Sequence, residues 1–345
     1  MGVDQDMPVS RRTFLLTPIG LAACKFDPST YQVSGATMGT NFNVTVANAP
    51  SELSQRSIER AVSDALSKAN KHLSNWDQSS EISRLNSIYA TSQIPVSPIL
   101  SEVLRCAVDI QKKSAGRFDV TIAPLLELWG FGATERRSRP PAPESVARVM
   151  NYSRQERILE FGLNTVRKTK ADTQIILAAI GKGYGADLIG RSLEGIGATN
   201  FLVEIGGDLL AKGRNHLGLP WQIGIEEPIL SSNGVLDLVE VNNLGMASSG
   251  DYRNFFELDG VRYSHIVDPM TGLPVRHRTT SATVLANNAM LADAWATALL
   301  TLGREEGLKV ADANEVAVMF TEGPLSKSKK DVTITKNIWF KSLSA

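Results

Sequence analysis

The order of helical and strand-like patterns along the chain constrains the fold more than any other feature. Apolar residues recur at helical spacing over 52–74, after Ser97-Pro98, and again over about 289–312. Between about 200 and 286 the chain instead shows short apolar stretches broken by Gly, Asn and Pro, which is typical of successive hairpins. Because helices flank a strand-rich centre, we predict an α+β fold rather than repeated βαβ units.

Shorter patterns complete this outline. Alternating apolar residues predict a strand over 42–46, and Ser97-Pro98 is an N-cap followed by Pro at the first helical position of a helix that Gly116 closes. Further elements are expected as strands over 156–161, 164–169, 315–320 and 331–335, a short helix over 146–150 and a helix that opens after Gly181-Lys182-Gly183.

Length and composition exclude several classes of protein. At about 150 residues per domain, 345 residues suggest two domains or one large one. The balance of 36 basic and 36 acidic residues, with 6% aromatics, argues against a nucleic-acid partner. Two cysteines cannot form a structural zinc site or a disulfide framework. The chain also lacks a Walker A loop, a Rossmann fingerprint, a G-x-S-x-G elbow and an H-x-x-x-H pair.

Residues 1–23 have the pattern of a targeting segment. Arg11 and Arg12 precede an apolar stretch that is about half the ~20 residues of a membrane-spanning helix. The stretch ends in Leu-Ala-Ala before Cys24, which resembles the lipobox of bacterial lipoproteins, and S-R-R-T-F-L resembles a twin-arginine signal. The alternative is an exposed tail with an incidental Cys. We expect export, lipid on Cys24, a tether over 24–32 and one folded unit over 33–345.

Dense clusters of Gly and polar residues, without periodicity, are the candidates for a functional site. They are G-A-T-M-G-T from Gly35, S-N-W-D from Ser74, G-R-F-D-V-T from Gly116, A-A-I-G-K-G-Y-G-A-D from Ala178, E-I-G-G-D from Glu204, S-S-G-D-Y-R from Ser248, S-H-I-V-D-P from Ser264 and A-D-A-W-A-T from Ala292. Such clusters are what a bound polyphosphate ligand requires, because close backbone approach needs Gly and charge needs polar partners.

Each candidate side chain also has a structural interpretation. Lys182 lies at a Gly-rich helix start that suits an anion, but it fits a surface Lys equally well. Met38 and Trp76 could lie against a flat ring, or belong to a tight turn and a hydrophobic plug. Asp119 is either a hydrogen-bonding anchor or a helix cap, and His265 is either a general base or a structural His.

Asp293 and Thr297 are spaced four residues apart on a predicted helix and therefore lie on one face. A carboxylate and a hydroxyl are hard oxygen ligands of the kind Mg²⁺ prefers, with phosphate oxygens and waters completing its coordination. The alternative is an exposed Ala-rich helix, but the apolar neighbours wrap most of its circumference, which favours a buried functional face.

Taken together, these clusters resemble the ApbE family of flavin transferases over about residues 33–320. The ordered set M-G-T, S-x-W, F-D-V-T, I-G-K-G, I-G-G-D, S-G-D-Y-R, H-I-V-D-P-x-T-G and A-D-A-x-x-T carries the resemblance. It implies an enzyme that uses Mg²⁺ to cleave the pyrophosphate of FAD, transfers FMN to a Ser or Thr hydroxyl of a target flavoprotein and releases AMP.

The resemblance also implies roles by position. The FAD site would be lined by Met38, Trp76, Arg117, Phe118, Asp119, Lys182, His265 and Ile266. The metal would be held by the carbonyl of Ala179 and the side chains of Asp293 and Thr297, with His265 as base. Ile176 stands where the family usually has an Asp, and Arg117 where a small residue is common. The resemblance therefore does not fix the affinity for the metal or the contacts at the edge of the ligand.

The implied partners are FAD and an acceptor flavoprotein subunit of a membrane electron-transfer complex. With the lipobox, the implied location is the periplasmic side of the bacterial inner membrane, through a lipid anchor. Two alternatives use the same residues. One is an FAD pyrophosphatase that gives FMN and AMP, and the other is a non-catalytic flavin-binding lipoprotein.

Overall fold

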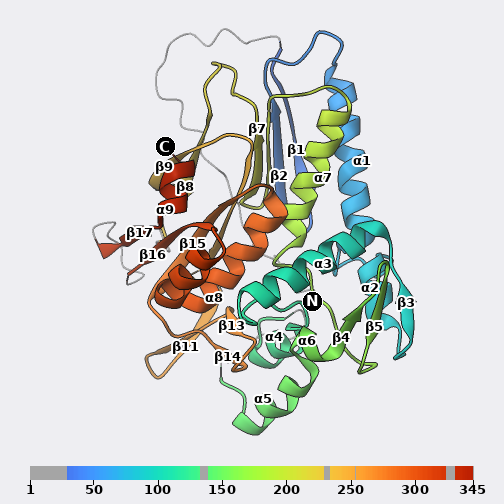
Figure 1. Cartoon of the computed structure of the whole chain (residues 1–345), viewed down its shortest axis with the longest axis vertical. Helices are drawn as coiled ribbons and strands as arrows, with labels where there is room; N and C mark the ends of the chain where they lie inside the picture. The colour runs from blue at the N-terminus through green and yellow to red at the C-terminus, as the bar shows by residue number, and fades with distance from the viewer. Residues whose placement is uncertain (1–28, 133–138, 229–233, 253, 324–330, 345) are drawn as a thin grey trace, which may run out of the picture.

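An eight-stranded antiparallel sheet forms the centre of the molecule (Figure 1). The computed structural model describes residues 29–132, 139–228, 234–252, 254–323 and 331–344. The sheet order is β1-β2-β6-β7-β10-β15-β16-β17. Its strands are β1 (Tyr31–Thr37), β2 (Thr40–Val46), β6 (Phe201–Ile205), β7 (Asp208–Lys212), β10 (Leu244–Gly250), β15 (Thr279–Ala286), β16 (Ala317–Glu322) and β17 (Thr333–Lys336).

Helices cover one face of this sheet and a hairpin covers the other. The first face carries α1 (Gln55–Leu73), α7 (Gly181–Gly195) and α8 (Ala289–Ala313), with α3 (Pro98–Lys113) packed on α8. The second face carries β8 (Trp221–Glu226), β9 (Val235–Val241) and α9 (Ile338–Leu343). Because both faces are covered, β15 is buried almost throughout: Ala282 and Val284 face the helices and Leu285 faces the hairpin.

Smaller elements complete the chain around one end of α3 and α8. They are α2 (Glu81–Ser87), α4 (Ala123–Trp129), α5 (Pro143–Val149), the 3₁₀ turn η1 (Met150–Tyr152), α6 (Gln155–Ile158), the sheet of β3 (Gln93–Pro95), β5 (Thr165–Lys168) and β4 (Leu159–Phe161), the hairpin of β11 (Phe255–Leu258) and β12 (Val261–Ser264), and the hairpin of β13 (Val267–Asp268) and β14 (Leu273–Pro274).

The α+β prediction is confirmed, and most predicted elements are present. Ser97 caps α3 with Pro98 at its first position, as the sequence predicted. The expected tether over 24–32 overlaps β1, because that strand starts at Tyr31. The helix predicted over 289–312 is interrupted at Gly303, whose φ of 74° and ψ of 171° are not helical. The ring of His277 occupies the space where a side chain at 303 would stand.

Three close contacts fix the start of α8. A Cβ on Gly245 of β10 would lie 2.2 Å from the carbonyl carbon of Asn288, so the helix begins directly on the strand. The Asp187 carboxylate of α7 accepts hydrogen bonds from the amides of Ala289 at 2.8 Å and Met290 at 2.9 Å. Asp187 therefore acts as a cap supplied by a neighbouring helix, and it sets the position of α8 relative to α7.

The signal-like segment 1–23, Cys24 and Arg253 lie outside the described residues. No helix in the described part of the chain is long and apolar enough to cross a membrane.

Candidate functional site

Three charged side chains from three elements meet at the start of α7. Lys182 on α7 forms an ion pair with Asp208, the first residue of β7, and its Nζ lies 3.9 Å from Oδ1 of Asp293 on α8. Asp208 follows the tight turn Gly206-Gly207, whose positive φ values of 57° and 99° favour glycine. The structure thus joins the I-G-K-G, I-G-G-D and A-D-A-x-x-T motifs, and it gives Asp208 a role that the sequence did not assign.

Asp293 is the most perturbed carboxylate of this group. Its side chain is buried, at 3% exposure, and its Oδ2 accepts a hydrogen bond of 3.1 Å from the Gly183 amide. Burial first, and the charge of Asp208 second, raise the pKa of Asp293 to about 7. A nearby cation would stabilise the ionised carboxylate, which is the electrostatic condition for a metal ligand.

The donor set around Asp293 fits a hard divalent cation. The amide of Gly183, which in a regular helix would donate to the Ala179 carbonyl, donates instead to Asp293. No hydrogen bond found among the described residues ends on that carbonyl, which leaves it for a cation. One turn beyond Asp293 on α8, Thr297 Oγ1 lies 3.1 Å from Ser249 Oγ of β10. A carboxylate, a hydroxyl and a carbonyl are oxygen donors suited to Mg²⁺.

This set is not a complete protein cage. Within the described ranges no group of three or more His, Cys, Asp or Glu side chains could hold a metal ion. Mg²⁺ sites typically rely on one or two carboxylates together with substrate phosphates and water, so the sparse donor set agrees with a site completed by its substrate.

Gly183, near the start of α7, allows that helix to pack closely on α8. A Cβ on Gly183 would stand 2.2 Å from the Ala289 carbonyl oxygen and 2.9 Å from the Asp293 Cβ. The amide of Gly181 donates to Leu177 O and that of Gly183 to Asp293. The structure therefore assigns Gly183 to helix packing, and it pairs Lys182 with Asp208.

Met38 lies at the same centre, on the turn between β1 and β2. Met38 and Gly39 have φ of 49° and 72°, the pattern of a two-residue hairpin turn. The Met38 sulfur would be 3.5 Å from a Cβ on Gly185 of α7, so the turn packs on the helix that carries Lys182. Thr40 in turn packs on Gly206 beside Asp208. The M-G-T motif is thus both a tight turn and part of the site.

The irregular segment before α7 is held by two asparagines. Asn75 donates to Ile175 O at 2.7 Å and accepts from the Leu177 amide at 2.9 Å. Asn86 donates to Ile175 O and accepts from the Ile175 amide, both at 2.8 Å. The neighbouring amide of Ile176 donates to Val120 O at 2.7 Å. Asn75 was not predicted as functional, yet it fixes the path toward Ala179.

Trp76 follows Asn75 and is 73% exposed. This exposure agrees both with a partly exposed hydrophobic plug and with a ring that stacks on a ligand. An exposed indole is free to stack on a ligand ring.

The Arg117-Phe118-Asp119 segment divides between surface and interior. Phe118 is buried in the main core. Asp119 accepts hydrogen bonds of 2.6 Å from both the amide and hydroxyl of Thr121, and one of 3.0 Å from the Gln155 amide. Asp119 combines the two roles considered, because it anchors the turn at Thr121 and also caps the first amide of α6, which begins at Gln155. Only Arg117 reaches outward, with Nε 3.5 Å from Asp268 Oδ1.

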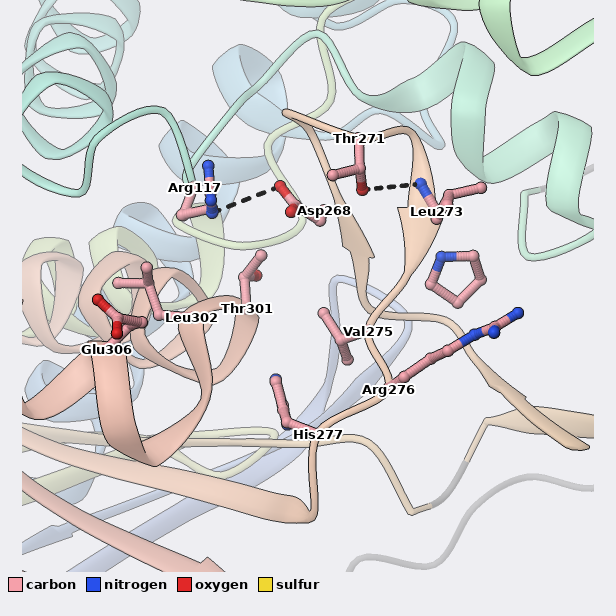
Figure 2. A pocket seen from close by; sticks show the side chains of 11 residues that line it. Arg117, Asp268, Thr271, Leu273, Val275, Arg276, His277, Thr301, Leu302 and Glu306 are labelled. Atoms are coloured by element: carbon pink, nitrogen blue, oxygen red, sulfur yellow. Dashed lines mark hydrogen bonds and ion pairs between the residues drawn. The ribbon is translucent and has the colours of Figure 1, made fainter. Parts of the chain in front are cut away.

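Arg117 and Asp268 border a cavity of about 400 Å³ between the β13–β14 hairpin and the kink in α8 (Figure 2). Thr271, Val275, His277, Thr301 and Glu306 also line it. At its upper edge the cavity brings Arg117, which precedes the F-D-V-T motif, to Asp268 of the H-I-V-D-P-x-T-G motif, and the dashed line in Figure 2 marks this pair.

His265 has a defined tautomer at the end of β12. Its Nδ1 lies 3.0 Å from the carbonyl oxygen of Asn254, which can only accept a hydrogen bond. Nδ1 therefore carries a proton, so of the two ring nitrogens Nε2 is the one that a general base would use. The neighbouring Ile266 is partly buried against the main core.

A row of stacked rings connects α4 to His265. Trp129 stacks on Tyr263 with ring centroids 5.8 Å apart, Tyr263 on Phe256 at 4.9 Å, and Phe256 on Phe131 at 5.8 Å. Phe131 meets the His265 ring edge-on at 6.3 Å. Since the β11–β12 hairpin pairs with no other strand of the described chain, this row of rings helps to place His265.

A buried ion pair supports the same hairpin. Asp251, just before it, pairs with Arg262 on β12, and burial raises the pKa of Asp251 to about 6 against the opposing effect of Arg262. Sequence reasoning did not single out this pair, and the only signal was the acidic residue within S-G-D-Y-R.

Comparisons with known proteins identify relatives of this chain. A model of the ApbE family matches residues 38–320. An FAD:protein FMN transferase of Haemophilus influenzae is 38% identical over 310 residues, 87% of this chain and 88% of that protein. The FAD:protein FMN transferase of Vibrio cholerae is 36% identical over 299 residues, which cover 87% of this chain and 89% of that protein.

Solved structures extend the likeness to the fold. The flavin transferase ApbE from Vibrio cholerae superposes with a TM-score of 0.82 at 34% identity, covering 91% of this chain and 99% of that one. The ApbE protein from Thermotoga maritima gives 0.79 at 27% identity, covering 92% and 99%. These matches agree with the motif order and with the fold, and the chain belongs to the ApbE family.

Proposed function

We propose that the chain transfers FMN from FAD to a Ser or Thr hydroxyl of a target flavoprotein, with Mg²⁺, and releases AMP. The observation that carries this proposal is the meeting of Lys182, Asp208 and Asp293 at the start of α7, in a chain of the ApbE family. The curated relatives are named FAD:protein FMN transferase, which supports the same activity here.

The residues of the site divide the work of phosphoryl transfer. Asp293, Thr297 and the Ala179 carbonyl would hold Mg²⁺, which when bound neutralises charge on the pyrophosphate. Lys182 would bind pyrophosphate oxygens, and Asp208 keeps its ammonium at the start of α7. Met38 and Trp76 would contact the ligand's rings, and the chain around Arg117 to Asp119 and Ile266 would close its edge.

His265 would take the proton of the acceptor hydroxyl at Nε2. The acceptor oxygen then forms a bond to the phosphorus of the FMN phosphate, while the bond from that phosphorus to the bridging oxygen breaks. The electron pair leaves with AMP, and the proton passes from His265 to solvent or product. The hydrogen bond from Nδ1 to Asn254 O keeps the ring in the required tautomer.

The location belongs to the proposal as well. The lipobox-like segment ending at Cys24 supports a lipid anchor on the periplasmic side of the inner membrane. An acceptor that reaches such an enzyme is expected in the same compartment, as a flavoprotein subunit of a membrane electron-transfer complex.

One assay tests the activity. The purified chain, FAD, Mg²⁺ and a candidate acceptor are mixed and separated on a denaturing gel. A fluorescent acceptor band with one AMP per flavin supports transfer, and EDTA or Asp293→Ala should abolish it. Release of FMN and AMP without an acceptor would instead identify a pyrophosphatase. Tight FAD binding without turnover, with any acceptor or metal, would identify a flavin-binding protein.

A further inference from the structure

The described chain begins beside one end of the sheet. The Ser29 carbonyl accepts a hydrogen bond of 2.9 Å from the Ala49 amide, and the Tyr31 hydroxyl donates to Leu53 O at 3.2 Å. The adjacent Asn48 side chain donates to the carbonyl of Asn215, in the loop between β7 and β8, at 3.3 Å. Ser29, the first described residue, and the β7–β8 loop therefore lie at the same end of the molecule, at the top in Figure 1.

The β7–β8 loop presents two leucines to solvent at this end. Leu217 is 68% exposed and Leu219 is 50% exposed. We call residues 213–220 the apex loop. Together the two leucines form a small apolar surface at the tip of the loop.

Asn215 satisfies much of the backbone of the apex loop internally. Its side-chain oxygen accepts hydrogen bonds from the backbone amides of Leu217 at 2.9 Å and Leu219 at 3.1 Å. The backbone amide of Asn215 donates to Leu219 O at 2.8 Å. The Arg214 side chain caps the carbonyl of Gly218 at 3.0 Å. A loop with paired backbone groups can enter an apolar phase at much lower cost than an open one.

The length of chain before Ser29 restricts how far the anchor lies from this surface. Four residues separate Cys24 from Ser29. Five peptide steps of at most about 3.6 Å span no more than about 18 Å. If Cys24 carries lipid, the bilayer must therefore lie close to the end of the molecule that bears the apex loop.

We propose that the apex loop is a membrane-contacting element, with Leu217 and Leu219 inserted at the lipid headgroup–acyl boundary and Arg214 and His216 among the headgroups. This inference rests on the proposed lipid anchor at Cys24. Exposed basic residues beside apolar tips are the composition of interfacial segments, and a second weak contact adds to what a single lipid attachment provides.

The contact would fix the height of the catalytic centre above the bilayer. Lys212, just before the apex loop, pairs with Glu194 near the end of α7 at 3.6 Å, and Asn48 joins the loop to the end of the molecule where β1 starts. Met38 and Lys182 lie at the opposite ends of β1 and α7. The 15 residues of α7 span about 22 Å at 1.5 Å per residue. Acceptor hydroxyls would therefore be modified at about that distance from the headgroups.

A fluorescent probe on the full-length acylated chain tests the contact. Leu217→Cys is labelled with an environment-sensitive nitrobenzoxadiazole maleimide and bound to phosphatidylethanolamine–phosphatidylglycerol vesicles that contain spin-labelled lipid. Acylation occupies Cys24, and burial raises the pKa of the Cys106 thiol to about 12, which suppresses its labelling. The matched control is Leu163→Cys, on an equally apolar side chain that is 77% exposed in the β4–β5 turn.

We expect the probe at 217 to shift to shorter wavelength and to lose about half or more of its emission to the spin-labelled lipid, as a group about 5–10 Å inside the interface would. The probe at 163 should not respond. If the protein binds vesicles but the probe at 217 responds no more than the probe at 163, the loop contact is overturned and the lipid anchor is not. A response at 217 that needs added acceptor protein instead of lipid would reassign the surface to a protein partner.

Flotation separates failure of the anchor from failure of the loop contact. Wild type should float with vesicles, and Cys24→Ser should float several-fold less. If wild type does not float, the anchor is wrong and the inference falls with it. If it floats without a response at 217, only the loop contact is wrong.

Discussion

Asp293 combines a stability cost with a functional role. Its carboxylate is buried beside Asp208, so the folded state holds a proton there more tightly than the unfolded chain does. Because its pKa rises from the ordinary 3.8 to about 7, its contribution to stability is present below pH 4 and is lost as the pH rises through 7. Buried charge is tolerated where a ligand or metal compensates for it, which is the case proposed here.

Asp293→Asn should therefore stabilise the metal-free protein relative to wild type as the pH rises from 5 to 8. The difference should grow by at most about 1.4 kcal/mol per pH unit, the value for one proton. Urea unfolding in EDTA at several pH values measures it. Glu160→Gln is the control, because Arg167 lowers the pKa of that exposed carboxyl and the trend should not appear. A pH-independent difference at position 293 would contradict the assignment.

His265→Ala should lower kcat by about 10²–10⁴-fold, the usual contribution of a general base. FAD affinity should fall far less, since the proton transfer concerns the acceptor hydroxyl. Single-turnover transfer and FAD titration separate the two quantities. Equal losses in affinity and kcat would assign the ring to ligand binding alone.

At the scale of elements, the site depends on how closely α7 approaches α8. Gly183 touches the Ala289 carbonyl, Asp187 caps α8, and the Gly183 amide reaches Asp293. These contacts bring two functional helices together without any ligand. Position 183 requires glycine because the backbone of α8 lies so close that a methyl group there has no space.

Gly183→Ala should lower the free energy of unfolding by about 1–3 kcal/mol, as overpacking does, and should weaken metal binding. Gly195→Ala, at the other end of the same helix, is the matched control because a Cβ there meets nothing within 4 Å. That variant should be unchanged or more stable by up to about 1 kcal/mol. Denaturant unfolding and Mn²⁺ titration measure both, and equal behaviour of the two variants would refute the packing argument.

At the scale of the whole molecule, the site draws on segments from Met38 to Thr297. Ligands that bridge these segments should stabilise the folded chain by mass action, by about 2.7 kcal/mol at a hundred times the dissociation constant. FAD and Mg²⁺ together should raise Tm by more than the sum of their separate effects, while Asp293→Ala should remove the excess. Differential scanning fluorimetry tests this, and purely additive shifts would argue against a shared site.

Prediction from sequence succeeded where local spacing decides the outcome. The α+β class followed from periodicity, the cap of α3 from Ser97-Pro98, and the shared face of Asp293 and Thr297 from their four-residue separation. It failed where contacts are distant in sequence. Asp208 and the Asp251–Arg262 pair were not assigned, and the glycines of α7 could not be placed, because their partners depend on how strands and helices pack.

The sequence by itself determined the helical face of Asp293 and Thr297, the ordered motifs of the ApbE family and the export-like pattern that ends at Cys24, since these depend on covalent order and helical repeat. Only the tertiary structure decided that Lys182 pairs with Asp208 beside Asp293, that Nδ1 of His265 donates to Asn254 O, and that Leu217 and Leu219 lie at the same end of the molecule as Ser29. Those contacts join residues far apart in the chain, so sheet register and close packing set them.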